Sequence, residues 1–188
     1  MVYRHILIIG TLALFLALVS TAIQIGPVPI AVADSELSNG IGIPVRITIP
    51  RVNVDAVIES VGLTEGGAMD APNGPSPAGW FSFGTRPGEI GSAVIAGHSG
   101  WKDNIPAAFD ELNKLHIGDK IFVVDDNGAT ITFIVRKVQL YDPKADASDI
   151  FGSSDGKAHL NLVTCEGVWD TVSKSSSKRL VVFTDKEE

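Results

Sequence analysis

The sequence predicts a mostly β domain, either a barrel or a sandwich, with one or two short helices. Most apolar segments have the length of strands, and several alternate apolar with polar residues. Turn formers are common, with 19 Gly and 10 Pro among 188 residues, whereas aromatic residues make up only 7%. The tripeptide Asp126-Asn127-Gly128 lies between two apolar segments, which is a strong hairpin signal. Together these features favour strands and turns over helices.

The first half of the domain is expected to hold up to four short strands. Residues 43–63 alternate apolar and polar side chains, and Pro50 divides them into two strands. Residues 64–79 are rich in turn formers, and a short strand or turn follows at residues 79–84. Residues 92–96 predict a buried strand that stops at Gly97-His98.

The second half is expected to continue the sheet around one short helix. Phe109, Leu112 and Leu115 recur at a spacing of three, which predicts that helix. The remaining expectations, in order, are a hairpin over 120–142, a long loop with room for one helical turn over 143–157, a strand over 158–165, a loop over 166–178 and a final strand over 179–185.

An uncharged apolar segment lies near the N-terminus. Arg4 and His5 precede residues 6–25, and about 20 helical residues span the roughly 30 Å core of a bilayer. The basic residue before the segment and the acidic residues after it put the N-terminus inside and the domain outside. Residues 1–25 are thus expected to be a membrane anchor, or a signal peptide cleaved after residues 31–33, followed by a linker (26–42) and one domain (43–188).

Charge and composition narrow the partners. The formal net charge of −7, without any basic cluster, argues against nucleic acid, because the phosphate backbone would be repelled. The sequence also shows no cluster of metal ligands, so no metal is expected.

Cys165 is the only cysteine. Exported proteins use cysteines in pairs, and a single one cannot form an internal disulfide. What remains is a buried inert thiol, an intermolecular bridge or a reactive nucleophile. Leu160 and Leu162 are expected in the core, so the odd-numbered residues 159–165 point to the other face, and Cys165 lies there at a strand end.

His98 is the best candidate for a base beside Cys165. His5 flanks the apolar segment, and His116 lies in a turn where a surface role is expected. His159 precedes Cys165 by six residues on one strand, roughly 20 Å at about 3.3 Å per residue. His98 follows a buried strand in a glycine-rich stretch, where active sites are commonly placed.

Arg179 opens the strand after the cysteine. If the two strands are neighbours, its guanidinium returns to the thiol, where a fixed donor could stabilise an oxyanion. The alternative is a solvated charge at a strand end, as expected of Arg46 and Arg136.

Three segments in this order resemble the sortases, the cysteine transpeptidases of bacterial cell surfaces. They are "AVIAGHSGW", "LVTCEG" and "KRLVVF". The family motif Thr-Leu-x-Thr-Cys matches residues 161–165 except that Asn161 replaces the first Thr. The family His and Arg fall on His98 and Arg179. "IPRVNVDAVIESVGL", "GAMDAPNGPSPAGWF" and "FDELNKLHIGDKIFV" extend the resemblance over residues 43–185, and the last two are similar to class E and class F sortases.

The resemblance implies a closed barrel of eight strands, a retained single-pass anchor in the cell membrane, and a reaction without cofactor or metal. Cys165 would cleave a Leu-Pro-x-Thr-Gly-like sorting signal between Thr and Gly. The thioacyl group of the surface protein would pass to an amine of a peptidoglycan precursor or a pilin. His98 would carry the proton, and Arg179 would hold the substrate and the oxyanion together with the backbone N–H of Glu166.

The same resemblance implies that Val163 and Thr164 contact the substrate. Asn161 is expected to be structural, and the Glu166 carboxylate should point to solvent because it would oppose a thiolate. Loops 142–157 and 166–178 are expected to wall the groove and to set selectivity.

Other functions are compatible with parts of the sequence. L,D-transpeptidases carry a His-Gly-Cys signature that is absent here, and papain-like enzymes place Cys before His. A non-catalytic exported β-domain that binds a surface polymer or protein would explain the fold with a silent Cys165. A hydrolase with the sortase fold also stays open.

Overall fold

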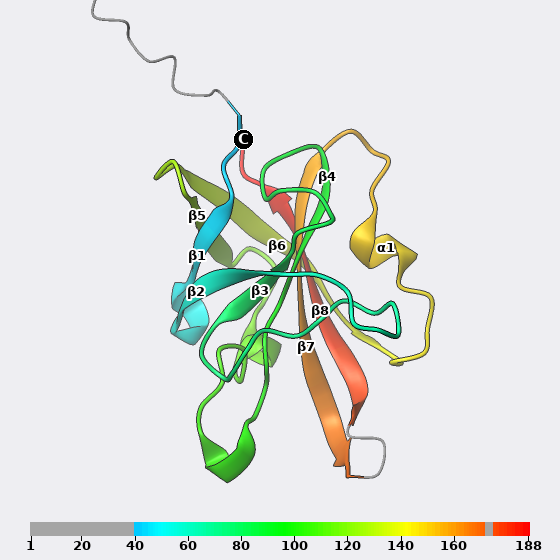
Figure 1. The fold of residues 1–188 in the computed structure, drawn as a ribbon. Helices are drawn as coiled ribbons and strands as arrows, with labels where there is room; N and C mark the ends of the chain where they lie inside the picture. The colour runs from blue at the N-terminus through cyan, green and yellow to red at the C-terminus, as the bar shows by residue number, and fades with distance from the viewer. Residues whose placement is uncertain (1–39, 172–174) are drawn as a thin grey trace, which may run out of the picture. The chain divides into compact units, whose positions relative to one another are not determined.

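The computed structural model describes residues 40–171 and 175–188, which form a closed barrel of eight strands (Figure 1). The barrel closes in the order β1-β2-β3-β4-β7-β8-β6-β5. The mostly β prediction is confirmed, and the barrel is the correct one of its two alternatives. The strands are β1 (Pro44–Ile49), β2 (Val54–Val61), β3 (Ala78–Phe81), β4 (Gly91–Ala96), β5 (Lys120–Asp125), β6 (Thr130–Tyr141), β7 (Ala158–Asp170) and β8 (Ser175–Lys186).

Local signals set the predicted turns. Pro50 begins the 3₁₀ turn η1 (Pro50–Val52) between β1 and β2, as expected from its missing N–H. In the β5–β6 hairpin the Asp125 carboxylate accepts hydrogen bonds from the N–H groups of Asn127 (3.1 Å) and Ala129 (2.8 Å). Gly128 takes the left-handed conformation that this turn needs (φ 82°).

The position of β7 determines where the site forms. β7 lies between β4 and β8, parallel to β4 and antiparallel to β8. In Figure 1 the labelled β4, β7 and β8 run side by side in the barrel wall, near the middle of the view. The pairing of β4 with β7 therefore brings together residues that are 67 positions apart in sequence. The pairing of β7 with β8 brings Cys165 beside Arg179, which is 14 positions further along the chain.

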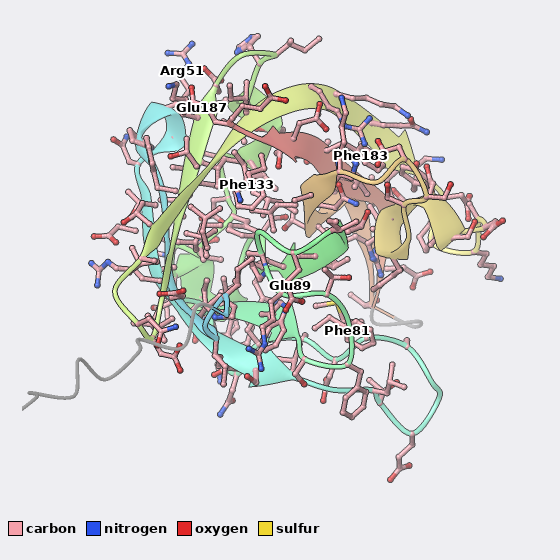
Figure 2. All side chains as sticks on the ribbon, turned by 90° about the horizontal axis from the view of Figure 1, so that it is seen from above. Arg51, Phe81, Glu89, Phe133, Phe183 and Glu187 are labelled. Atoms are coloured by element: carbon pink, nitrogen blue, oxygen red, sulfur yellow. The ribbon has the colours of Figure 1, made fainter. Side chains whose placement is uncertain are left out.

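Two apolar clusters stabilise the barrel. The larger fills its interior, and Figure 2 shows Phe133, which is wholly buried, inside the barrel. The smaller consists of Val94, Ile150, Val181 and Phe183 and lies beneath α1 (Ser148–Phe151). The single helical turn expected in the 143–157 loop is thus confirmed.

The helix expected around Phe109 is a run of 3₁₀ turns. The backbone bonds Leu112 N–H to Phe109 O (3.2 Å) and Leu115 N–H to Leu112 O (3.2 Å) span three residues, and only η3 (Leu112–Lys114) is regular. A second short turn, η2 (Lys102–Asn104), precedes it. A spacing of three aligns side chains in a 3₁₀ helix, and the three apolar residues are buried together in this different helix type.

The prediction of a loop over residues 166–178 is also wrong for most of this segment. β7 continues to Asp170 and β8 begins at Ser175, so the two strands form a long hairpin that pairs Glu166 with Lys178. Gly167 adopts φ 83° where the register shifts, which is typical of a bulge. The polar composition of this segment concealed the pairing.

The predicted anchor (1–25) and residues 26–39 of the predicted linker lie outside the described residues. Within 40–171 and 175–188, no helix is long and apolar enough to cross a membrane.

Candidate active site

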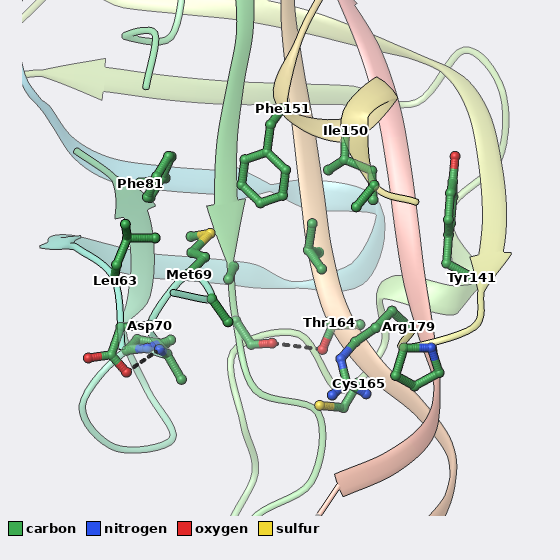
Figure 3. Close-up of a pocket in the computed structure, with 18 of the residues that line it drawn as sticks. Leu63, Met69, Asp70, Phe81, Tyr141, Ile150, Phe151, Thr164, Cys165 and Arg179 are labelled. Carbon is green, nitrogen blue, oxygen red and sulfur yellow. Dashed lines mark hydrogen bonds between the residues drawn. The ribbon is translucent and has the colours of Figure 1, made fainter. Parts of the chain in front are cut away.

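Cys165 lies on β7 directly opposite Arg179 on β8. Their Cα atoms are partners in the antiparallel register, and opposed residues of such a pair project to the same face of the sheet. Both side chains are half-buried and line one cavity of about 620 Å³. Figure 3 shows the Arg179 guanidinium beside the Cys165 side chain at one end of this cavity. The sequence had left open whether Arg179 approaches the thiol, and the register decides that it does.

Arg179 differs from the other arginines named with it. Arg46 pairs with Asp55 (2.6 Å) and Arg136 with Asp185 (2.9 Å), each at an exposed site. The Arg179 Nη1 donates to the backbone carbonyls of Ser176 (3.1 Å) and Lys178 (3.0 Å). The expected solvated role fits Arg46 and Arg136 and does not fit Arg179.

His98 reaches the same cavity through the parallel pairing of β4 with β7. The register joins Gly91 to Ala158, an offset of 158 − 91 = 67, and His98 and Cys165 differ by the same 165 − 98 = 67. Past the end of β4, His98 is therefore level with Cys165. Both residues line the cavity together with Arg179. The predicted trio thus occupies corresponding positions on three adjacent chain segments.

Three hydrogen bonds hold this register beyond the end of β4. The Gly97 N–H donates to the Val163 carbonyl (3.0 Å), and the Thr164 hydroxyl donates to the Gly97 carbonyl (2.7 Å). The Ser99 hydroxyl donates to the carbonyl of Cys165 (2.5 Å). The chain on both sides of His98 is therefore fixed to the segment that carries Cys165.

The His98 ring contacts Pro72 and Trp101. Its Nε2 lies 3.0 Å from the carbonyl oxygen of Pro72. The Trp101 ring packs edge-on against it, with centroids 4.7 Å apart. The side chain is half-buried.

The other predicted contact residues have different roles. Val163 and Thr164 line the cavity, although the Thr164 hydroxyl is occupied by Gly97. Glu166 does not line this cavity; it lies at a second, smaller pocket beside Leu140 and Leu180. The expected solvent-facing direction of its carboxylate and the role of its backbone N–H as an oxyanion donor stay predictions.

The face of β7 that the sequence placed away from the core is covered at Asn161 and His159. Asn161 is wholly buried, and its Nδ2 donates to the Ile150 carbonyl of α1 (2.6 Å). His159 is also buried, between Asp185 (2.7 Å) and Asp155 (3.0 Å). Its ring is thus engaged six residues along β7 from Cys165. Asn161 is structural, as expected.

The cavity walls come from two long connections. The predicted 142–157 loop contributes one wall, including Ile150 and Phe151. The other wall is made by Leu63 and residues 67–72, of which sequence reasoning described 67–72 only as turns. The described residues of the predicted selectivity loop 166–178 do not line the cavity. A long connection rich in Gly and Pro inside a compact domain is often functional, and this signal could have identified residues 63–72.

Tyr141 gives this apolar cavity a neutral polar group. Burial and the hydrogen bond that its hydroxyl donates to Asp149 (2.5 Å) raise the pKa of Tyr141 to about 12. The phenol is therefore protonated at physiological pH. In the described part of the chain no cluster of His, Cys, Asp or Glu could hold a metal ion.

The arrangement places a thiol, an imidazole and a guanidinium at one end of a mainly apolar cavity. This combination suits acyl transfer, in which a thiol attacks a carbonyl, an imidazole protonates the leaving amine and a fixed positive charge stabilises the oxyanion.

Comparisons with known proteins agree with this geometry. The family model described as Sortase domain matches residues 47–187. Among solved structures, a lid mutant of sortase A from Corynebacterium diphtheriae has a TM-score of 0.62 and 22% identity, covering 78% of this chain and 70% of that chain. Sortase C-1 from Actinomyces oris has a TM-score of 0.60 and 24% identity, covering 77% of this chain and 75% of that one.

Sortase C1 from Streptococcus agalactiae gives a TM-score of 0.60 at 24% identity, with 77% of this chain and 67% of that chain covered. At these identities the likeness shows the fold. No curated protein matches the sequence. The similarity to class E and class F sortases stays a prediction.

Proposed function

Because the chain belongs to the sortase family, we propose that it is a cysteine transpeptidase that cleaves a Leu-Pro-x-Thr-Gly-like sorting signal between Thr and Gly. The observation that carries this proposal is the register that brings His98, Cys165 and Arg179 to one end of a single cavity. A non-catalytic β-domain would have no need of this convergence.

The reaction has two halves. The Cys165 thiolate attacks the Thr carbonyl carbon, a C–S bond forms, and the carbonyl electrons move to an oxyanion that faces Arg179. Collapse of this intermediate breaks the C–N bond, and protonated His98 gives its proton to the leaving Gly amine. An acceptor amine then attacks the thioester, its proton passes to His98, and the thiolate is released.

The cavity suits the apolar part of such a signal. Away from Cys165 and Arg179 its walls carry apolar side chains, among them Leu63, Ile150 and Phe151 (Figure 3). A Leu-Pro segment could lose its hydration there, at about 25 cal/mol per Å² of apolar surface buried. This supports an apolar residue upstream of the scissile Thr.

The proposal includes the setting of the enzyme. Residues 1–25 would retain the protein in the cell membrane as a single-pass anchor, with the barrel outside the cytoplasm. Substrates would be surface proteins with a C-terminal sorting signal, and the acceptor would be an amine of a peptidoglycan precursor or a pilin. Sequencing the N-terminus of the mature protein checks the anchor, and a start at Asp34 would contradict it.

The activity is tested with a library of sorting-signal peptides, glycine and lysine amines, and product identification by mass spectrometry. Cys165→Ala and His98→Ala should abolish transfer, and Arg179→Ala should reduce it about 10²–10³-fold, as losing one oxyanion donor typically does. His116→Ala, which changes an exposed imidazole, is the matched control and should keep full activity. Products carrying water in place of an amine would identify a hydrolase.

The absence of any product would leave the non-catalytic binding domain as the alternative. The rate of thiol alkylation separates this alternative from the transpeptidase. An activated Cys165 is alkylated quickly and more slowly after His98→Ala, whereas a silent thiol reacts slowly in both proteins.

A further inference from the structure

The loop that carries Pro72 reaches the His98 ring and determines which ring nitrogen can exchange protons. A backbone carbonyl has no hydrogen to give, so the 3.0 Å contact between His98 Nε2 and the Pro72 oxygen requires that Nε2 carries the proton. In the neutral ring the lone pair is then on Nδ1. Proton exchange with the thiol and with the leaving and incoming amines must pass through Nδ1.

The position of the Pro72 carbonyl is fixed from both sides. Pro72 is buried, and its ring packs over Gly79 of β3, where a Cβ would lie 3.4 Å from the Pro72 Cδ. On the N-terminal side, the Asp70 N–H donates to the Gly62 carbonyl (2.9 Å). On the C-terminal side, the Asn73 N–H donates to the Glu59 carboxylate (2.5 Å).

Glu59 contributes a side chain to the contacts that fix the Pro72 carbonyl. It lies on β2, where its register partner is Gly79, so the strand pair that supports the Pro72 ring also carries the carboxylate. Neither Glu59 nor Asn73 lines the cavity, whereas Pro72 does. Glu59 therefore acts on the imidazole only through the adjoining peptide group.

We propose that Glu59 is a positioning residue for the proton carrier: by binding the Asn73 N–H it fixes the Pro72 carbonyl, which holds His98 as the Nε2–H tautomer. The reaction is the one proposed above, and the inference rests on that function only for its kinetic consequence. The tautomer itself is a property of the resting protein.

The first test reads the tautomer directly. The full chain in detergent micelles, labelled with ¹⁵N-histidine, is measured at alkaline pH where imidazoles are neutral, and His98→Gln identifies the His98 signals. The expected result is a protonated Nε2 and an unprotonated Nδ1. In Glu59→Ala the two nitrogen shifts should move toward each other as the tautomers mix. A wild-type ring protonated on Nδ1 would overturn the proposal, whether or not transfer is detected.

The second test is kinetic. Glu59→Ala should lower kcat about tenfold, a part of the ~10²–10⁴-fold that a positioned acid–base group contributes, with KM within twofold. Glu59→Gln keeps an oxygen acceptor for the Asn73 N–H and should retain both the tautomer and kcat. Glu65→Ala removes an exposed carboxylate from the same connection and is the matched control.

Two further outcomes would refute the role of Glu59. An unchanged tautomer and kcat in Glu59→Ala would show that the Pro72 carbonyl is held without it. Equal losses in Glu59→Gln and Glu59→Ala would assign the effect to charge. A melting temperature for each variant separates these results from unfolding.

Discussion

Substituting Gly97, the residue before His98, tests how tightly the site is fixed to the core. Gly97 is not among the glycines with positive φ, so its backbone tolerates alanine. The obstacle is space, because an added Cβ would lie 2.4 Å from Cδ2 and 2.6 Å from Cγ of the Phe109 ring. Optimal carbon–carbon contacts are about 3.5–4.0 Å, so ring and chain must separate by about 1 Å.

The surrounding structure resists that movement. Phe109 is wholly buried, and its N–H donates to the His98 carbonyl (2.9 Å). The backbone of Gly97 is itself hydrogen-bonded to Val163 and Thr164. Overpacking a rigid core costs about 1–3 kcal/mol, and we expect Gly97→Ala to fall near the upper end, about 3 kcal/mol. Because a shift of about 1 Å can cost ~10²-fold in rate, transfer should fall by a similar factor in the folded protein.

Stability is measured by urea unfolding of residues 40–188, which contain all eight strands of the barrel, with tryptophan fluorescence as the signal. Gly66→Ala is the matched control, since its Cβ would meet only Thr64 Oγ1 at 3.8 Å, and its cost should be within about 0.5 kcal/mol. Phe109→Leu should relieve the clash, so that the double variant is more stable than the sum of the single effects predicts. A Gly97→Ala protein as stable as wild type, or strict additivity, would refute this reasoning.

Three further predictions concern ionisable groups. With its pKa raised to about 12 by burial and the neighbouring carboxylate, Tyr141 should stabilise the fold below pH 10 and lose this contribution as pH rises from about 10 to 12. Tyrosinate absorbance of the Tyr3→Phe chain, which leaves one tyrosine, checks this, and titration near 10 would contradict it. Hydrogen bonds from His159 and from backbone and hydroxyl donors lower the pKa of Asp155 below its usual 3.8. The stabilisation of the fold by this carboxylate is then present above pH 4 and lost in acid. Asp155→Asn should therefore melt at a lower temperature than wild type at pH 7, and the difference should disappear as pH falls below 4. His159→Ala should be less stable yet keep transfer per folded molecule, because the ring lies far along β7 from Cys165, and a folded but inactive His159→Ala would contradict the assignment of His98.

The sequence by itself determined much of the fold. Alternation placed β1 and β2, and two apolar segments placed β5 and β6. Pro50 and the tripeptide ending at Gly128 marked the turns within these two pairs, because these signals act within a few residues. A spacing of three marked Phe109, Leu112 and Leu115 as a short helical segment, which the structure forms as 3₁₀ turns. The single thiol, in a chain expected to be exported, pointed to Cys165.

Only the tertiary structure decided how distant segments meet. The offset of 67 between β4 and β7 makes His98 level with Cys165, and the pairing of β7 with β8 selects Arg179 over Arg46 and Arg136. Leu63 and residues 67–72 became a wall of the cavity in the same way. These relations depend on the closure of the barrel, in which the register of each strand is set together with those of its neighbours. Local patterns of side chains do not determine that register.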